Sequence, residues 1–325
     1  MTIARAQLIQ LALTQYYHCI SRCVRRAFLC GYDHATQTSF DHRKLWLVER
    51  IHLLSSVFTI DVAAYAIMSN HYHLVLNVNQ TAAKKLTDHE VAERWLMLFK
   101  GNKLVDRYLA GDESVAETAQ VTLAKWRARL FDISWFMRSL NEYIAKKANE
   151  EDDCTGRFWE GRFKSQPLLD EKALLAAMTY VDLNPIRAKL CKSIPDSEFT
   201  SAYERLHGKP CRESNAHTLK PLMSFIGDSD DQDRDALPFT RRQYFQLLDW
   251  SSRQSARGKT GVVDDYQPPL LDQLSFNASD WCLLCYSLEK LGLSAMGSLD
   301  RIEQFYKARG IKRRPQNSDL AKLFA

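Results

Sequence analysis

A hairpin pattern with two histidines is the feature that most restricts how this chain can fold. Residues 62–68 are mostly apolar, Ser69-Asn70 favours a tight turn, and residues 71–78 form a second apolar stretch. Side chains along a strand point alternately to its two faces, so His71 and His73 share one face and the intervening apolar residues share the other. The pattern predicts two antiparallel strands with one packing face and one histidine-bearing face.

Two imidazoles one strand period apart can bind the same divalent cation if a further ligand comes from elsewhere in the fold. His71 and His73 are therefore candidate metal ligands. A His-x-His triplet also occurs in strands that bind nothing, so the surrounding residues have to decide between the two interpretations.

Length and composition indicate a globular protein. The chain has 325 residues, of which 46% are hydrophobic and 26% charged, and we expect two regions, residues 1–191 and 192–325. No apolar run approaches the roughly 20 residues that a membrane span requires, and the N-terminus lacks a signal-peptide pattern, so we expect a cytoplasmic protein without membrane contact. Eight cysteines are too sparse for a disulfide scaffold, and a net charge of +5 is mild.

The first half of the chain alternates predicted strands and helices. Residues 16–23 favour a strand whose end is basic through Arg22 and Arg25, and Asp41 is expected to cap a helix that runs to about Phe58. A charged helical region over residues 81–130 is expected to be an insertion. Asp132 then opens a further helix, and Tyr143 lies at the edge of its apolar stripe.

The segment from Gly156 to Lys164 alternates arginines with aromatic residues. This pattern suits a strand or loop that packs rings on one side and offers guanidinium groups to phosphates on the other. Asp170 is expected to cap the next helix, and Asn184-Pro185 to break it. From about residue 192 linker-like stretches alternate with short amphipathic helices, which predicts a mainly helical C-terminal extension of unknown role.

Taken in order, these motifs resemble those of the single-tyrosine HUH transposases, most closely the REP-associated tyrosine transposases. The resemblance covers about residues 15–190. It rests on His71-Tyr72-His73, the run Gly-Arg-Phe-Trp-Glu-Gly-Arg-Phe-Lys-Ser from residue 156, and the run Tyr-Val-Asp-Leu-Asn-Pro-Ile-Arg-Ala from residue 180. The resemblance implies an α+β fold, with a ferredoxin-like antiparallel sheet and flanking helices.

The resemblance also implies an activity, namely cleavage and rejoining of single-stranded DNA beside hairpins through a 5′-phosphotyrosine, with Mg or Mn as the cofactor. His71 and His73 match the paired metal ligands, and Tyr143 is assigned as the nucleophile. In the family an amide often lies one helical turn after the tyrosine and completes the metal shell. That position holds Lys147, which cannot ligate while protonated, so Glu150 is expected to substitute.

Two hypotheses follow. The first is an active DNA nuclease and strand transferase. The second, motivated by Lys147, is a domesticated hairpin DNA-binding protein with impaired catalysis. An RNA-binding ferredoxin-like domain ranks last, because it would need exposed aromatic residues on the sheet. Monomer and homodimer both remain open. The expected DNA contacts are Arg22, Arg25, Arg157, Arg162, Lys164 and Arg187.

Overall fold

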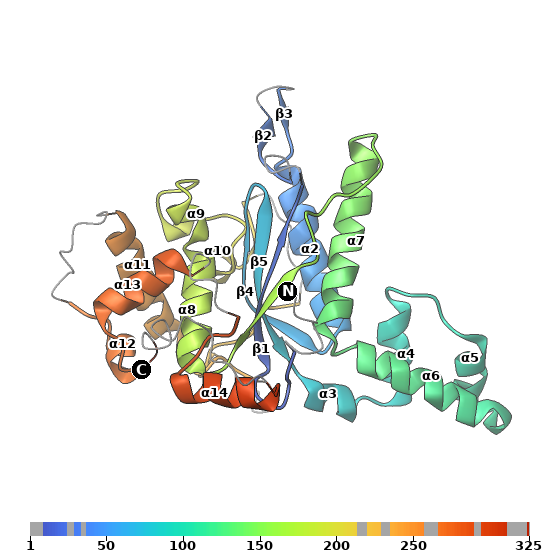
Figure 1. The fold of residues 1–325 in the computed structure, drawn as a ribbon. Helices are drawn as coiled ribbons and strands as arrows, with labels where there is room; N and C mark the ends of the chain where they lie inside the picture. Colours follow the sequence, from blue (N-terminus) through green and yellow to red (C-terminus); the bar gives the residue numbers. More distant parts are fainter. Residues whose placement is uncertain are drawn as a thin grey trace.

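A four-stranded antiparallel sheet forms the centre of the computed structural model, with helices on both faces (Figure 1). The structure describes residues 9–24, 29–33, 37–212, 220–228, 235–256, 266–288, 294–310 and 324. The strands, in the spatial order β4-β5-β1-β6, are β4 (Ile60–Ile67), β5 (His71–Val78), β1 (Tyr16–Arg22) and β6 (Lys164–Leu168). A helix follows β1 and another precedes β6, so the path is βαββαβ with ferredoxin-like strand order. The expected fold class is confirmed.

The β4–β5 hairpin lies where the sequence predicts it. Its turn at Ser69-Asn70 is closed by the Met68 amide, which donates to the His71 carbonyl at 2.9 Å. β5 pairs with β4 on one side and with β1 on the other. The two histidines of β5 therefore lie in the interior of the sheet, where neighbouring strands fix their orientation. A small second sheet joins β2 (Tyr32–Asp33) and β3 (Thr38–Ser39).

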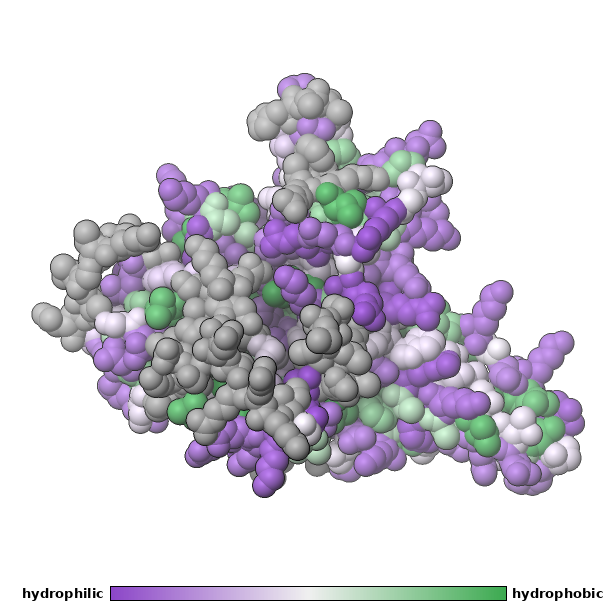
Figure 2. All heavy atoms as spheres, viewed as in Figure 1, coloured by the Kyte–Doolittle hydropathy of each residue, from purple (hydrophilic) through white to green (hydrophobic). Residues whose placement is uncertain are grey.

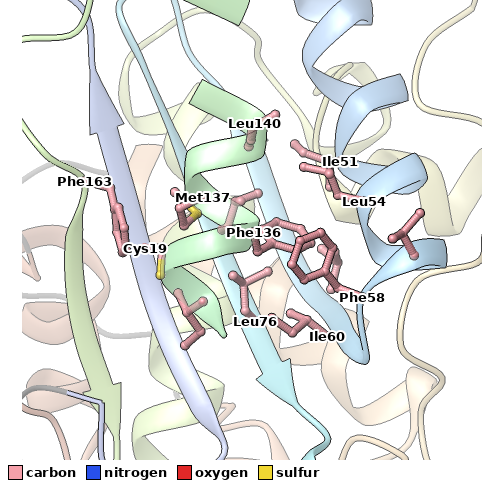
Figure 3. Packing of buried hydrophobic residues seen from close by; sticks show 14 of the residues in the cluster. Cys19, Ile51, Leu54, Phe58, Ile60, Leu76, Phe136, Met137, Leu140 and Phe163 are labelled. Carbon is pink, nitrogen blue, oxygen red and sulfur yellow. The ribbon is translucent and has the colours of Figure 1, made fainter. Parts of the chain in front are cut away.

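One face of the sheet is covered by α2 (His42–Val57) and α7 (Ile133–Glu151) (Figure 1). Figure 3 shows Phe136, Met137 and Leu140 of α7 packed between α2 and the strand residues Cys19 and Leu76. Tyr72, Leu74 and Leu76 of β5 all belong to this core. The apolar side chains of the alternating pattern thus face α2 and α7. Burial of their apolar surface stabilises this packing.

The N-terminal ends of these two helices differ. Asp132 caps α7 as expected, since its carboxylate accepts from the Ser134 amide at 2.6 Å. The expected cap at Asp41 is wrong: its backbone is already helical, its side chain makes no capping hydrogen bond, and it pairs with Lys44 at 2.7 Å. An ion pair within the first turn replaces the cap.

The insertion predicted over residues 81–130 forms an arm beside α7 (Figure 1). Trp95 and Trp126 stack with ring centroids 5.3 Å apart, and Trp95 also lies 5.7 Å from Trp135 of α7, which ties the arm to the main body. Hydrophilic side chains predominate over the described surface in this view, with hydrophobic ones among them on the arm (Figure 2). The arm comprises α3 (Gln80–Lys85), α4 (Asp88–Leu96), α5 (Lys103–Leu109) and α6 (Ala116–Arg129).

The histidine-bearing face of the sheet is covered by α8 (Glu171–Asp182), which packs on β4 and β5. Asp170 caps this helix as expected, through a hydrogen bond from the Ala173 amide at 2.9 Å. Every residue of α8 from Ala173 to Asp182 is buried. A helix that is buried all round needs a partner on each side, and the second partner comes from the C-terminal half of the chain.

That second layer includes Leu248, Trp281 and Leu284, which share one hydrophobic core with α8. The boundary expected after residue 191 thus falls within a continuous core. Among the described residues no helix is long and apolar enough to cross a bilayer. The helices of this part are α9 (Asn184–Arg187), α10 (Ser201–His207), α11 (Arg241–Ala256), α12 (Pro269–Gln273), α13 (Ala278–Ser287) and α14 (Leu299–Ala308).

Candidate metal and nucleic-acid site

Three histidines meet on the sheet face that α8 covers. His71 and His73 lie on β5, with ring centroids 4.9 Å apart, and His18 lies on the neighbouring strand β1. His18 Nε2 and His73 Nδ1 are 3.0 Å apart, which is hydrogen-bond distance, and the two rings stack. The structure therefore brings the two predicted ligands together and adds a third imidazole.

Burial keeps these imidazoles neutral. Burial, and then the nearby charge of Arg22, lowers the pKa of His71 from 6.5 to about 4. Burial is also the main cause that lowers the pKa of His73 well below its usual range, followed by the neighbouring histidines and the cations Arg187 and Arg22. A neutral imidazole has a lone pair for a metal, whereas a protonated one does not.

A tyrosine of α8 faces the histidine cluster. The ring centroid of Tyr180 lies 5.7 Å from that of His73 and 6.1 Å from that of His18, with edge-on geometry in both pairs. Asn184 follows one helical turn later, and the backbone between them stays helical at Leu183. The guanidinium carbon of Arg187 lies 4.1 Å from the Tyr180 ring centroid. A tyrosine ring with a cation stacked on it therefore lies beside the histidines, and an amide follows one helical turn along the chain.

The predicted nucleophile Tyr143 lies elsewhere. It is on α7, 36% exposed, under the guanidinium of Arg50 at 4.6 Å. α7 covers the opposite face of the sheet, as the hydrogen bond from the Tyr72 hydroxyl to Asn141 at 2.6 Å shows. The sheet itself separates Tyr143 from the histidines. The expectation that Tyr143 lies beside His71 and His73 is wrong. The sequence pattern predicts a helix around Tyr143 but does not predict which face of the sheet that helix covers.

The predicted ligand Glu150 is also remote from the histidines. It lies near the end of α7, its side chain is 66% exposed, and it pairs with Lys146 at 3.8 Å. It borders a separate surface pocket of about 470 Å³ together with Asn149 and Gly156. Lys147 extends over Trp46, 4.1 Å from the ring centroid, and lies on the same side of the sheet as Tyr143. Neither residue takes part in the histidine site.

A pocket of about 640 Å³ opens beside His18, along β1 and β6. Three of the expected DNA contacts line it, namely Arg22, Arg162 and Lys164, and Glu160 is the acidic residue among its lining. Arg187, over Tyr180, is the fourth expected contact that lies near the histidines. Basic side chains around a cleft attract a phosphate backbone.

The other expected DNA contacts are not brought to this pocket. Arg157 donates from Nε to the Trp159 carbonyl at 2.9 Å within its own loop, and Arg25 lies outside the described residues. The rings of the same loop turn inward: Phe158, Trp159 and Phe163 are at most 9% exposed. The prediction that the rings of this segment pack on one side is confirmed. They lie in the core and do not offer a stacking surface to bases.

Sequence reasoning missed Tyr180, although the signal was present. The run from Tyr180 to Pro185 places an amide four residues after a tyrosine, which is the spacing that the resemblance requires of a nucleophile and its neighbouring ligand. The sequence interpretation used this run as a helix break and as a motif of the resemblance, and it assigned no role to Tyr180. His18 was missed because an isolated histidine in a strand carries no pattern of its own.

Two of the imidazoles, His71 and His73, offer nitrogen ligands for a divalent cation. Among the described residues, no three His, Cys, Asp or Glu side chains form a group that could hold a metal, so a third protein ligand would come from another type of group, of which an amide is one. Asn184 is 7% exposed, and its amide nitrogen has no hydrogen-bond partner in the described part of the chain. Oxygen and nitrogen of an amide exchange places by a flip of the group, so Asn184 can present an oxygen ligand.

The fold and the site together define a class of protein: a ferredoxin-like sheet that carries buried histidines against a tyrosine on a covering helix. No family model matches the chain, and no curated protein matches it. Among solved structures, it is similar to a REP-associated tyrosine transposase bound to a REP hairpin, with 12% sequence identity and a TM-score of 0.38. The match covers 69% of this chain and 100% of that one. A similarity of this size carries no argument about activity.

Proposed function

We propose that this protein is a metal-dependent transposase-like enzyme that cleaves and rejoins single-stranded DNA beside hairpins, with Tyr180 as the nucleophile. The observation that carries the proposal is the placement of Tyr180 on the same sheet face as His71 and His73, with Asn184 one turn away. The basic pocket beside His18 supports DNA as the substrate.

In the proposed reaction the Tyr180 oxygen attacks phosphorus, the bond to the 3′-oxygen breaks, and a 5′-phosphotyrosine and a 3′-hydroxyl result. The phenolic proton leaves to solvent, and the departing 3′-oxygen takes up a proton. A 3′-hydroxyl from another strand end can later attack the phosphotyrosine, which restores a phosphodiester and releases Tyr180. No external nucleotide is needed, because the phosphotyrosine conserves the bond.

The neighbours of Tyr180 have distinct tasks. Arg187, over its ring, favours the phenolate and can donate to the phosphate, since its Nη1 is buried and has no hydrogen-bond partner among the described residues. His71, His73 and Asn184 would hold the cation. When bound, Mg or Mn supplies charge neutralisation at the non-bridging oxygens and aligns the leaving group.

Access to the tyrosine requires a rearrangement. Tyr180 is only 2% exposed and its ring is covered by Arg187, whose Nη2 donates to the Tyr286 carbonyl at 3.2 Å. Binding of a DNA strand in the basic pocket must therefore displace Arg187 from its present contacts. A phosphate that attracts the guanidinium provides the energy for that displacement.

The alternative of a DNA-binding protein without catalysis was motivated by Lys147 in place of the family amide. Lys147 lies on the other side of the sheet from the histidines. Asn184 follows Tyr180 by one helical turn, which is the spacing expected between the nucleophile and the family amide. With Tyr180 as the nucleophile, that motivation no longer applies.

The test compares two tyrosine variants. Purified protein is incubated with Mn²⁺ and labelled single-stranded hairpin oligonucleotides from the DNA that flanks its gene, and covalent protein–DNA adducts are counted on denaturing gels. Tyr180→Phe is expected to lose the adduct entirely and keep DNA binding, because it removes the attacking oxygen alone.

Tyr143→Phe is the matched control, since it makes the same change on the opposite face of the sheet. It is expected to form the adduct as the unaltered protein does. An adduct that survives Tyr180→Phe and disappears with Tyr143→Phe would overturn the assignment. Tight hairpin binding without any adduct from the unaltered protein would favour the binding-only alternative.

A further inference from the structure

His18 is the one member of the histidine cluster that the proposed reaction does not use. It lies on β1, diagonally across from the β5 residue His73, with its Nε2 3.0 Å from His73 Nδ1. His18 is 1% exposed and His73 is fully buried, so water does not compete for this hydrogen bond. The contact is a feature of the interior and not of a mobile surface.

One of the two nitrogens in this hydrogen bond must carry the proton. If His73 Nδ1 carries it, the Nε2 of His73 keeps its lone pair and is the nitrogen that can bind a metal. Histidines that ligate metals almost always donate their other ring N–H to a fixed acceptor, which sets both tautomer and ring orientation.

His71 has an equivalent arrangement. Its Nδ1 lies 2.6 Å from the side-chain oxygen of Asn70, an acceptor, so His71 donates from Nδ1 and leaves Nε2 for a ligand. Both histidines of the pair are therefore engaged at the same ring atom. The partner of His71 is Asn70 in the turn, and the partner of His73 is His18 on the neighbouring strand.

On the far side of His18 lies Gln166, its register partner across the β1–β6 pair. His18 Nδ1 is buried and has no hydrogen-bond partner among the described residues. With the proton on this nitrogen, neutral His18 presents the lone pair of its Nε2 to His73.

We propose that His18 is a positioning residue that holds His73 in the Nδ1–H tautomer and thereby presents His73 Nε2 to a divalent cation. The inference rests on the proposed function in one respect, namely that His73 is a metal ligand. Loss of His18 would leave both His71 and His73 in the chain. The His73 ring, however, would be free to rotate and to change tautomer.

Two measurements on the full-length protein test this. The ¹⁵N chemical shifts of the His73 ring in metal-depleted protein report which nitrogen carries the proton, and calorimetry with Mn²⁺ alone reports metal affinity. The Nδ1–H tautomer is expected for His73. His18→Leu is expected to abolish that preference and to weaken Mn²⁺ binding by about 10- to 100-fold.

His18→Gln provides the conservative rescue, because its amide oxygen can reach the position of the imidazole Nε2 as an acceptor. It is expected to bind Mn²⁺ within about threefold of the unaltered protein. His52→Gln removes another buried imidazole, one that contacts Lys220 and Glu204 away from the site, and so controls for general loss of packing.

The outcomes separate the two proposals. An Nε2–H tautomer at His73 in the unaltered protein, or Mn²⁺ binding within about twofold in folded His18→Leu, overturns the role of His18. Should His18→Leu fail to fold, the tautomer and the His18→Gln affinity decide. If the unaltered protein binds no Mn²⁺, the metal part of the proposed function fails, whereas the tautomer measurement still decides on His18.

Discussion

Three imidazoles lie so close together that protonated rings would repel one another. His18 and His73 are buried and His71 is half-buried, and protonation of any one ring would place a cation next to the others, with Arg22 also near His71 and His73. Such a cluster is stable only as neutral rings. Neutral rings are also what a metal requires, so burial prepares the site for a ligand and makes it sensitive to acid.

The stability of the protein is therefore expected to fall in mild acid. Burial lowers the pKa of both His18 and His71 from 6.5 to about 4, so between these values the unfolded chain takes up protons that the folded chain does not. Their contribution to the free energy of unfolding is complete above pH 6.5 and is lost as the pH falls toward 4, by roughly 3 kcal/mol for each histidine.

Urea unfolding at a series of pH values measures this dependence. His18→Gln does not titrate in this range and is expected to show a shallower fall of unfolding free energy between pH 6.5 and 4. An identical slope in the variant would show that His18 is not the source of the dependence.

At the scale of elements, α8 places Tyr180 on the face of the sheet that carries the histidines. Its sequence is apolar all round, which predicts burial but gives no side for Tyr180. The choice is made by packing: small residues of α8 such as Ala176 and Ala177 share a core with Ala64 and Ala66 of β4. The helix therefore lies against the histidine face. The helices, strands and cap of this region could be read from the sequence, whereas the face could not.

A buried carboxylate next to the tyrosine ties α8 to its second layer. Asp182 accepts hydrogen bonds from the Ser201 hydroxyl, from the Ala202 amide at 2.9 Å and from the Tyr244 hydroxyl. Asp182→Ala is expected to cost about 3 kcal/mol of unfolding free energy, because it leaves these donors buried and unsatisfied. Chemical denaturation measures the loss.

Asp249→Ala is the matched control for this variant. Its side chain is 61% exposed and pairs with Arg253 within one helix at 3.2 Å, a contact that water and salt screen. The expected cost is below about 0.5 kcal/mol. Equal losses for the two variants would contradict the structural role of Asp182.

At the scale of the whole molecule, local patterns and the family resemblance together predicted the βαββαβ path but not the extent of its core. Strand alternation and helix caps act over a few residues, and they place the hairpin of His71 and His73 correctly. Contacts such as Trp281 and Leu284 against α8 join residues about 100 positions apart, for which a single sequence contains no periodic signal. The composition change near residue 192 therefore looked like a boundary although the core continues through it.

Because of this shared core, we expect residues 192–325 to be necessary for folding. A chain that ends at residue 191 would expose the outer side of α8, and each large side chain removed from the core, such as Leu248, Trp281 or Leu284, costs about 1.5–3 kcal/mol. A few such losses equal the 5–15 kcal/mol that stabilises a typical protein. We expect the 1–191 fragment to bind a hydrophobic dye and to show no cooperative thermal transition by circular dichroism.

Truncation after Gly310 is the informative comparison. It removes a single described core residue, Phe324, which packs on Phe276 with ring centroids 6.2 Å apart. One aromatic side chain is worth about 3 kcal/mol, so this shorter deletion is expected to lower the melting temperature and keep the transition cooperative. A 1–191 fragment that melts cooperatively at the temperature of the full chain would show instead that the sheet and α8 are stable alone, and that the C-terminal helices only rest against them.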